Sequence, residues 1–105
     1  MTATDGNSPG SMAFLGRLQE IIAERQSAPS DSSYTARLFA AGQARIAQKV
    51  GEEGVELALA SVTADRAQVV SEAADLLYHV LVLLRSRDAG LADVVAELES
   101  RHRAR

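Results

Sequence analysis

Residues 49–56 read KVGEEGVE and residues 72–79 read EAADLLYH, and these two segments decide the fold and its chemistry. Each segment carries two acidic residues three positions apart, Glu53 with Glu56 and Glu72 with Asp75, inside an otherwise apolar stretch. A helix places residues i and i+3 on one face, so each segment presents two carboxylates together. Four carboxylates on facing helices would repel one another and lose hydration unless a cation lay between them. The pattern therefore predicts a site for a hard divalent cation.

The ligand types indicate which metal this site would hold. Carboxylates without cysteine favour Mg²⁺, with Mn²⁺ as a substitute, because both ions take oxygen ligands and share the phosphate oxygens of a substrate. A di-iron bundle would carry Glu-x-x-His pairs, whereas His79 follows Asp75 by four positions. The bland alternative is an acidic face turned to solvent. Because the carboxylates interrupt the apolar stripe instead of opposing it, we favour the metal site.

Two further polar residues flank the acidic pairs. Lys49, one turn before Glu53, is expected either to bind phosphate oxygens or to form a salt bridge with Glu52 or Glu53. His79 is expected either to support the acidic residues from a second layer or to be a buried histidine with satisfied hydrogen bonds. The spacing alone leaves both alternatives open.

Apolar residues recur at helical spacing along most of the chain. They predict five helices. Four cover residues 14–26, 34–41, 43–62 and 91–103, and the remaining one, fourth in the chain, follows Thr63 or Asp65 and continues to about Asp88. Ser32 or Ser33 is expected to cap the second helix and Gly42 to end it. Thr63 or Asp65 is expected to cap the fourth helix, and Gly90 to close it in the left-handed conformation.

Composition agrees with one all-α domain. The 105 residues are 47% hydrophobic, with two prolines and four aromatic residues, which suits packed helices better than sheets. We expect a bundle of four to five helices over residues 12–105, preceded by a disordered tail over residues 1–11. The absence of cysteine excludes disulfides and thiolate catalysis.

The charge and hydropathy patterns bear on partners and location. A net charge of −3 provides no basic field, so nucleic acid is not an expected partner. No uninterrupted apolar run exceeds residues 80–84, and residues 1–11 contain neither a signal peptide nor an anchor, so no membrane association is expected. A cytoplasmic protein is the natural interpretation.

A homodimer is expected from apolar surface that one chain cannot cover. The helix over residues 43–62 has a second apolar arc, and the helix that follows is apolar over more than half its circumference. The second arc consists of Val55, Ala58, Leu59 and Val62. Four short helices could hardly cover both elements all round, so an association surface is predicted.

The acidic segments resemble those of the phosphoribosyl-ATP pyrophosphohydrolase family of histidine biosynthesis. That family belongs to the all-α NTP pyrophosphohydrolase superfamily, whose signature E-E-x-x-E followed by E-x-x-D is matched here by Glu52, Glu53, Glu56, Glu72 and Asp75. More specific to the family are Ser33-Tyr34-Thr35, the lead-in over residues 48–51, and the run over residues 75–79. The resemblance covers about residues 14–103. Arg37 stands where the family usually has lysine, and Gly54 where it usually has alanine.

The resemblance implies Mg²⁺-dependent hydrolysis of phosphoribosyl-ATP to phosphoribosyl-AMP and pyrophosphate. It implies Glu53, Glu56, Glu72 and Asp75 as metal ligands and Glu52 as the residue that orients or deprotonates water. Substrate phosphates or the phosphoribosyl group would meet Ser33, Tyr34, Thr35, Arg37, Lys49 and His79. The alternatives are a house-cleaning hydrolase of non-standard NTPs or dNTPs, and a non-catalytic helical interaction module.

Overall fold

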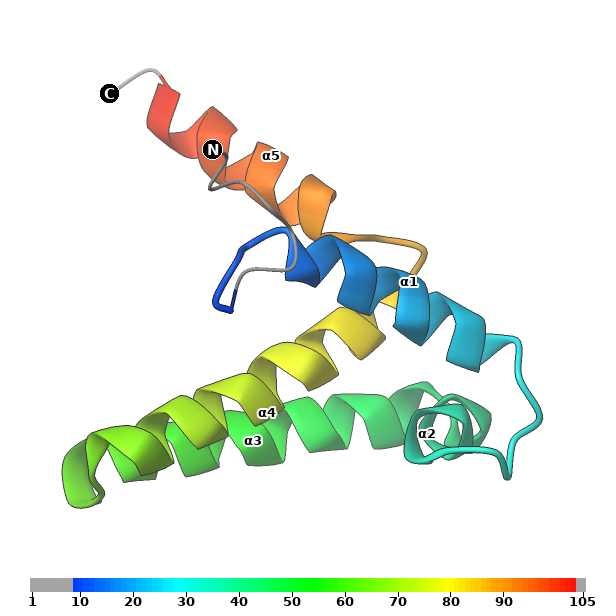
Figure 1. The fold of residues 1–105 in the computed structure, drawn as a ribbon, viewed down its shortest axis with the longest axis horizontal. Coiled ribbons are helices and arrows are strands. Elements are labelled where there is room, and N and C mark those ends of the chain that lie inside the picture. The colour runs from blue at the N-terminus through cyan, green and yellow to red at the C-terminus, as the bar shows by residue number, and fades with distance from the viewer. Residues whose placement is uncertain (1–8, 104–105) are drawn as a thin grey trace.

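The computed structural model describes residues 9–103, in which five helices follow one another through short loops (Figure 1). The helices are α1 Phe14–Gln26, α2 Tyr34–Ala41, α3 Gln43–Thr63, α4 Arg66–Ser86 and α5 Leu91–Arg103. The described residues contain no strand, so the predicted all-α fold is confirmed. Most of the tail predicted over residues 1–11 lies outside the described residues.

Side-chain caps fix where two of the helices begin. Ser33 Oγ accepts a hydrogen bond from the Ala36 N–H at 3.0 Å, at the start of α2. Asp65 Oδ1 accepts one from the Gln68 N–H at 2.9 Å, at the start of α4. Each cap satisfies an N–H group that the helix itself leaves without a partner. The second of the two serines and the aspartate are therefore the caps.

Positive backbone φ angles mark two of the helix ends. Gly42, with φ 102°, lies between α2 and α3, as predicted for a residue that ends a helix. The prediction for Gly90 is wrong, because the left-handed residue after α4 is Asp88, with φ 58°. The N–H groups of Asp88 and Ala89 donate to carbonyl oxygens of the last turn of α4, at 3.1 and 2.9 Å. This is the Schellman closure, and aspartate tolerates the left-handed conformation better than most residues.

The long helices α3 and α4 form an antiparallel hairpin, and α1 and α2 pack against its open end (Figure 1). The core lies at that end, where α1, α2, α3 and α4 meet. Its buried residues are Ile22, Leu38, Ile46, Leu81 and Val82. The other end of the hairpin therefore lacks cover from elsewhere in the described chain.

The α5 helix projects beyond α1, away from the hairpin (Figure 1). None of its residues is buried, although Leu91 packs at the edge of the core. The radius of gyration is 15.5 Å, compared with about 13 Å for a compact domain of this length. The single chain is thus more extended than a domain that completes its own core.

The α4 helix is long and apolar enough to cross a membrane by length and composition alone. The core helix of a soluble protein passes the same test. Glu72, Asp75 and His79 lie in the middle of α4, and such groups are costly in hydrocarbon. Only 17% of the apolar window is buried, so the described chain leaves most of this surface of α4 uncovered.

Candidate functional site

Three of the four predicted ligands gather between α3 and α4. One carboxylate oxygen each from Glu53, Glu56 and Glu72 lies within 4.8 Å of the other two. We call these three residues the acidic group. Glu53 is buried, Glu72 is half-buried and Glu56 is exposed. The acidic group is therefore closed on the Glu53 side and open to solvent on the Glu56 side.

Two oxygen atoms of the acidic group have no hydrogen-bond partner. Glu53 Oε1 and Glu72 Oε1 are buried, and no donor among the described residues reaches either of them. A buried carboxylate oxygen without a partner is costly, and such atoms are rare in folded proteins. Coordination to a hard cation would satisfy both oxygens at once. The residues present therefore fit a divalent metal ion.

The crowding of like charge raises the pKa of Glu56 above its ordinary value. The charge of Glu53 is the largest cause, followed by partial desolvation and the neighbouring carboxylate of Glu72. The positive charge of Lys49 lowers the pKa and offsets part of this. Carboxylates that share a site show this direction of shift when no cation neutralises them.

The fourth predicted ligand lies outside the acidic group. Asp75 is exposed, although it follows Glu72 by one turn on α4. Glu52, the predicted base, is also exposed, and its Oε2 accepts a hydrogen bond from Gln48 Nε2 at 2.9 Å. The structure thus brings three of the predicted ligands together and leaves two predicted carboxylates at the rim.

Lys49 lies against the acidic group. Its Nζ is 3.5 Å from Glu53 Oε2 and 3.8 Å from Glu52 Oε1. The side chain is 20% exposed, so it retains access to solvent. Of the two alternatives left open by the sequence, the ion pair is the one present in this structure.

His79 lies one turn beyond Asp75 on α4 and is buried. Its Nδ1 is 2.9 Å from the backbone carbonyl oxygen of Asp75, which can only accept, so this nitrogen carries the proton. In the neutral ring, Nε2 then accepts from the Tyr34 hydroxyl at 2.8 Å. Both nitrogens have partners outside the acidic group, which favours the alternative of a buried, satisfied histidine.

The start of α2 holds the remaining predicted substrate residues. Thr35 is buried and its hydroxyl is hydrogen-bonded to that of Tyr78. We call Tyr34, Thr35, Tyr78 and His79 the aromatic clamp, because these residues join α2 to α4. Arg37 is exposed, and Tyr34 is 45% exposed. Sequence reasoning missed the role of Tyr78 as a partner of Thr35, because 43 residues separate the two and no local spacing could show the contact.

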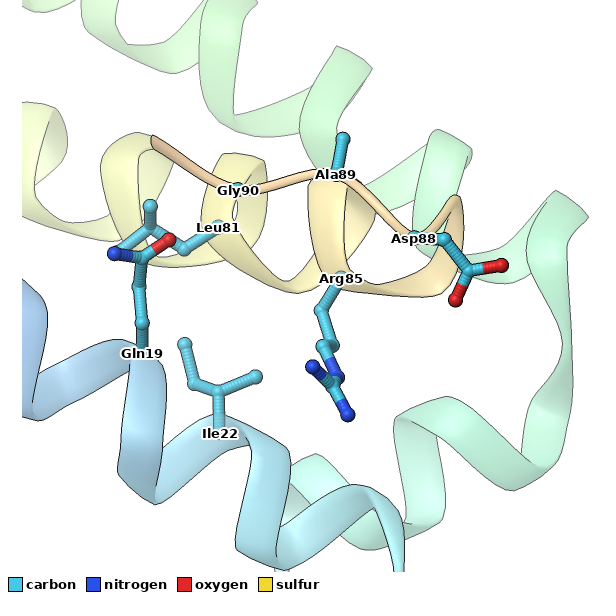
Figure 2. Close-up of a pocket in the computed structure, with 7 residues that line it drawn as sticks. All are labelled: Gln19, Ile22, Leu81, Arg85, Asp88, Ala89 and Gly90. Atoms are coloured by element: carbon cyan, nitrogen blue, oxygen red, sulfur yellow. The ribbon is translucent and has the colours of Figure 1, made fainter. Parts of the chain in front are cut away.

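Two cavities of about 320 and 350 Å³ lie away from the acidic group. The first lies between α1 and the end of α4, where Ile22 and Arg85 project into the gap between the helices (Figure 2). Its lining is Gln19, Ile22, Leu81, Arg85, Asp88, Ala89 and Gly90. None of these residues is a predicted site residue. A third cavity, of about 190 Å³, is lined by Tyr34, Arg37, Leu38, Ala41 and Arg45, so it adjoins two of the predicted substrate residues. None of these three cavities is lined by a carboxylate of the acidic group, which is therefore an open face.

The five helices and the acidic group between α3 and α4 define an all-α domain with a carboxylate site between two antiparallel helices. Comparison with known proteins gives the particular family. Residues 15–102 match the family described as Phosphoribosyl-ATP pyrophosphohydrolase. The chain belongs to this family, so the resemblance read from the acidic segments is confirmed.

Curated relatives support the same assignment. The chain is 50% identical over 99 residues to the histidine biosynthesis bifunctional protein HisIE of Vibrio parahaemolyticus, covering 94% of this chain and 47% of that protein. It is 59% identical over 90 residues to the HisIE protein of Xanthomonas campestris pv. campestris, covering 86% of this chain and 44% of that protein. The chain thus spans about half the length of the curated relatives it matches.

Proposed function

We propose that this chain hydrolyses phosphoribosyl-ATP to phosphoribosyl-AMP and pyrophosphate in the cytoplasm, as a Mg²⁺-dependent enzyme of histidine biosynthesis. The observation that carries the proposal is the pair of buried, unpartnered oxygens on Glu53 and Glu72. They lie within the two segments that carry the family's acidic motif. Membership of the family supports the choice of substrate.

Glu53, Glu56 and Glu72 would hold the metal, with Asp75 as a further ligand. Asp75 shares a helix face with Glu72, and an exposed side chain can change rotamer at little cost. When bound, Mg²⁺ or Mn²⁺ would neutralise charge on the leaving pyrophosphate and lower the pKa of the attacking water. The carboxylates of this chain would hold the metal ion at a fixed position relative to the substrate.

The residues at the rim would orient the attacking water and bind the substrate phosphates. Glu52, exposed beside the acidic group, would accept a hydrogen bond from the attacking water and orient it. Lys49 and Arg37 would bind phosphate oxygens, the first as a point charge and the second through its planar fork. The aromatic clamp would hold the start of α2, with Ser33 at its cap, at a fixed place against α4.

We further infer that the enzyme is a homodimer. Val55, Leu59 and Val62 on the outer side of α3 are all more than half exposed, and Val70 on α4 is 53% exposed. A second hairpin packed on this surface would complete a four-helix bundle and cover these side chains. Sedimentation at micromolar concentration tests this inference. A dimer is expected, and an active monomer of 11.2 kDa would refute it.

Pyrophosphate release from a panel of nucleotides tests the activity. Phosphoribosyl-ATP should be turned over far faster than ATP or any dNTP, and turnover should stop when a chelator removes divalent metal. Preference for a non-standard NTP or dNTP would favour the house-cleaning alternative. Metal binding without turnover of any nucleotide, or no metal binding at all, would refute the proposed enzyme.

A further inference from the structure

Lys49 is the only lysine in this chain, and every other basic residue among the 11 is an arginine. This one ammonium group lies against the acidic group, 3.5 Å from Glu53 Oε2 and 3.8 Å from Glu52 Oε1. The single lysine side chain of the sequence therefore lies beside the candidate metal site.

Lysine and arginine differ in how firmly they hold a carboxylate. An arginine can form two parallel hydrogen bonds to a carboxylate through its planar guanidinium, whereas a lysine is a point charge on a flexible stem. The distances from Lys49 Nζ exceed the 2.7–2.9 Å that is usual for a charge-assisted hydrogen bond. Lys49 therefore neutralises Glu53 by proximity and can leave without breaking a short hydrogen bond.

Lys49 and a metal ion would compete for the same carboxylate. Glu53 is both the partner of Lys49 and the buried member of the acidic group. A divalent cation held by Glu53, Glu56 and Glu72 would repel an ammonium group only a few ångströms away. Because Lys49 is 20% exposed, its side chain has a path toward solvent and toward any phosphate bound at the rim.

We propose that Lys49 is an exchangeable counter-ion: it neutralises Glu53 until a divalent cation enters, and is then displaced onto the phosphate oxygens of the substrate. This inference rests on the proposed function. It assigns the ammonium group two opposite effects, since Lys49 weakens metal binding and strengthens substrate turnover. A lysine with a purely structural role would do neither, and a lysine that organises the metal site would strengthen both.

Substitutions of Lys49 test the sign of each effect. Lys49→Met keeps the length of the side chain and removes its charge, so Mn²⁺ should bind about tenfold more tightly, because the metal no longer has to displace an ammonium group from Glu53. Lys49→Arg should bind Mn²⁺ more weakly than the wild type, because a guanidinium can hold Glu52 and Glu53 together. Both variants should turn over phosphoribosyl-ATP at least about tenfold more slowly.

Arg45→Met is the matched control. Arg45 is an exposed residue one turn before Lys49 on the same face of α3, and it forms no ion pair among the described residues. Its loss should change Mn²⁺ affinity by less than about twofold, since an exposed charge one turn farther away is strongly screened. Mn²⁺ binding in Lys49→Met that is equal to or weaker than wild type overturns the inference. Unchanged turnover in Lys49→Met overturns the part that concerns phosphate.

The single lysine also gives a direct spectroscopic test. Reductive methylation with ¹³C-formaldehyde labels Lys49, and its methyl signal can be told from that of the chain's α-amino group. Addition of Mg²⁺ alone should move the Lys49 signal toward its position in the metal-free Glu53→Gln variant, in which the ion pair with Glu53 is lost and Glu52 remains nearby. A Lys49 signal that does not respond to saturating Mg²⁺ overturns the displacement. Wild-type protein that binds neither metal would instead refute the proposed function.

Discussion

The middle of α4 carries two polar clusters two turns apart, and they differ in whether their polar atoms have partners. In the aromatic clamp, both nitrogens of His79 are hydrogen-bonded, and its ring lies nearly perpendicular to the Tyr34 and Tyr78 rings at centroid distances of 5.8 Å. In the acidic group, buried oxygens of Glu53 and Glu72 have no donor within reach among the described residues. A paired cluster is complete by itself, whereas an unpaired one requires a ligand.

This difference in hydrogen bonding distinguishes the residues that we propose bind the metal from those that stabilise the fold. Both clusters contain titratable side chains beside the family motif, so composition alone does not tell them apart. The unsatisfied oxygens and the raised pKa of Glu56 fit our proposal that the acidic group holds a cation. The satisfied His79 indicates a joint between α2 and α4. Substitutions in the two clusters should therefore affect different measurements.

Glu53→Gln should have the largest effect, on metal binding and turnover, without a loss of stability. Loss of the buried ligand should reduce Mn²⁺ affinity and slow phosphoribosyl-ATP turnover by at least about a thousandfold. Without metal, the melting temperature should stay the same or rise, because the substitution removes charge from a repulsive group. Thermal melting with and without Mg²⁺, together with a turnover assay, checks both parts. Retained turnover would show that Glu53 is not a ligand.

His79→Phe should act in the opposite way. Phenylalanine keeps a ring in the buried site but leaves the Tyr34 hydroxyl without its partner, so the free energy of unfolding should fall by about 2 kcal/mol. Metal affinity should change little, since neither nitrogen of His79 meets the acidic group. Chemical denaturation and Mn²⁺ titration measure the two effects.

Tyr34→Phe is the matched partner of that variant and should cost about 1 kcal/mol. The double variant should be non-additive, because the two side chains share one hydrogen bond. Additive losses in the double variant would show that Tyr34 and His79 act independently.

The smallest effect concerns pH. The pKa of Glu56 is higher in the folded state than in the unfolded state, so folding takes up a proton where the pH lies between the two values. Binding of this proton stabilises the folded state, and that contribution is fully present below the ordinary pKa of 4.5. It is lost as the pH rises through the raised pKa of the folded state. The metal-free protein should therefore melt at a lower temperature as the pH rises across this window, and Glu56→Gln should lessen the dependence. A dependence unchanged in the variant would show that other groups cause it.

The sequence predicted those features that depend on local spacing. The caps, narrowed to Ser32 or Ser33 and to Thr63 or Asp65, the helix end at Gly42 and the placing of Glu53 and Glu56 on one helix face all follow from residues within a few positions of one another. The mistake at Gly90 is also local in origin, since glycine is the commonest left-handed residue after a helix. In the structure Asp88, two residues earlier, takes the left-handed conformation.

The features that the sequence could not predict depend on distant contacts. Tyr34 and His79 are 45 residues apart, so no periodicity could show that the histidine would be satisfied by the tyrosine. The choice between a salt bridge and a phosphate contact for Lys49 depended on side-chain positions. Asp75 matches the motif as well as Glu72 does, yet its exposed side chain lies outside the acidic group. A linear motif identifies the candidate metal ligands, but it does not show which of their carboxylates lie close together in the folded chain.

Calorimetric titration of Mn²⁺ into the wild-type protein, Glu53→Gln and His79→Phe tests the central claim most directly. If the acidic group is the ligand site and the aromatic clamp is a structural joint, the wild type and His79→Phe should bind Mn²⁺ with affinities within a few-fold of each other. Glu53→Gln should show no measurable binding under the same conditions. Binding retained in Glu53→Gln, or lost in folded His79→Phe, would contradict the account.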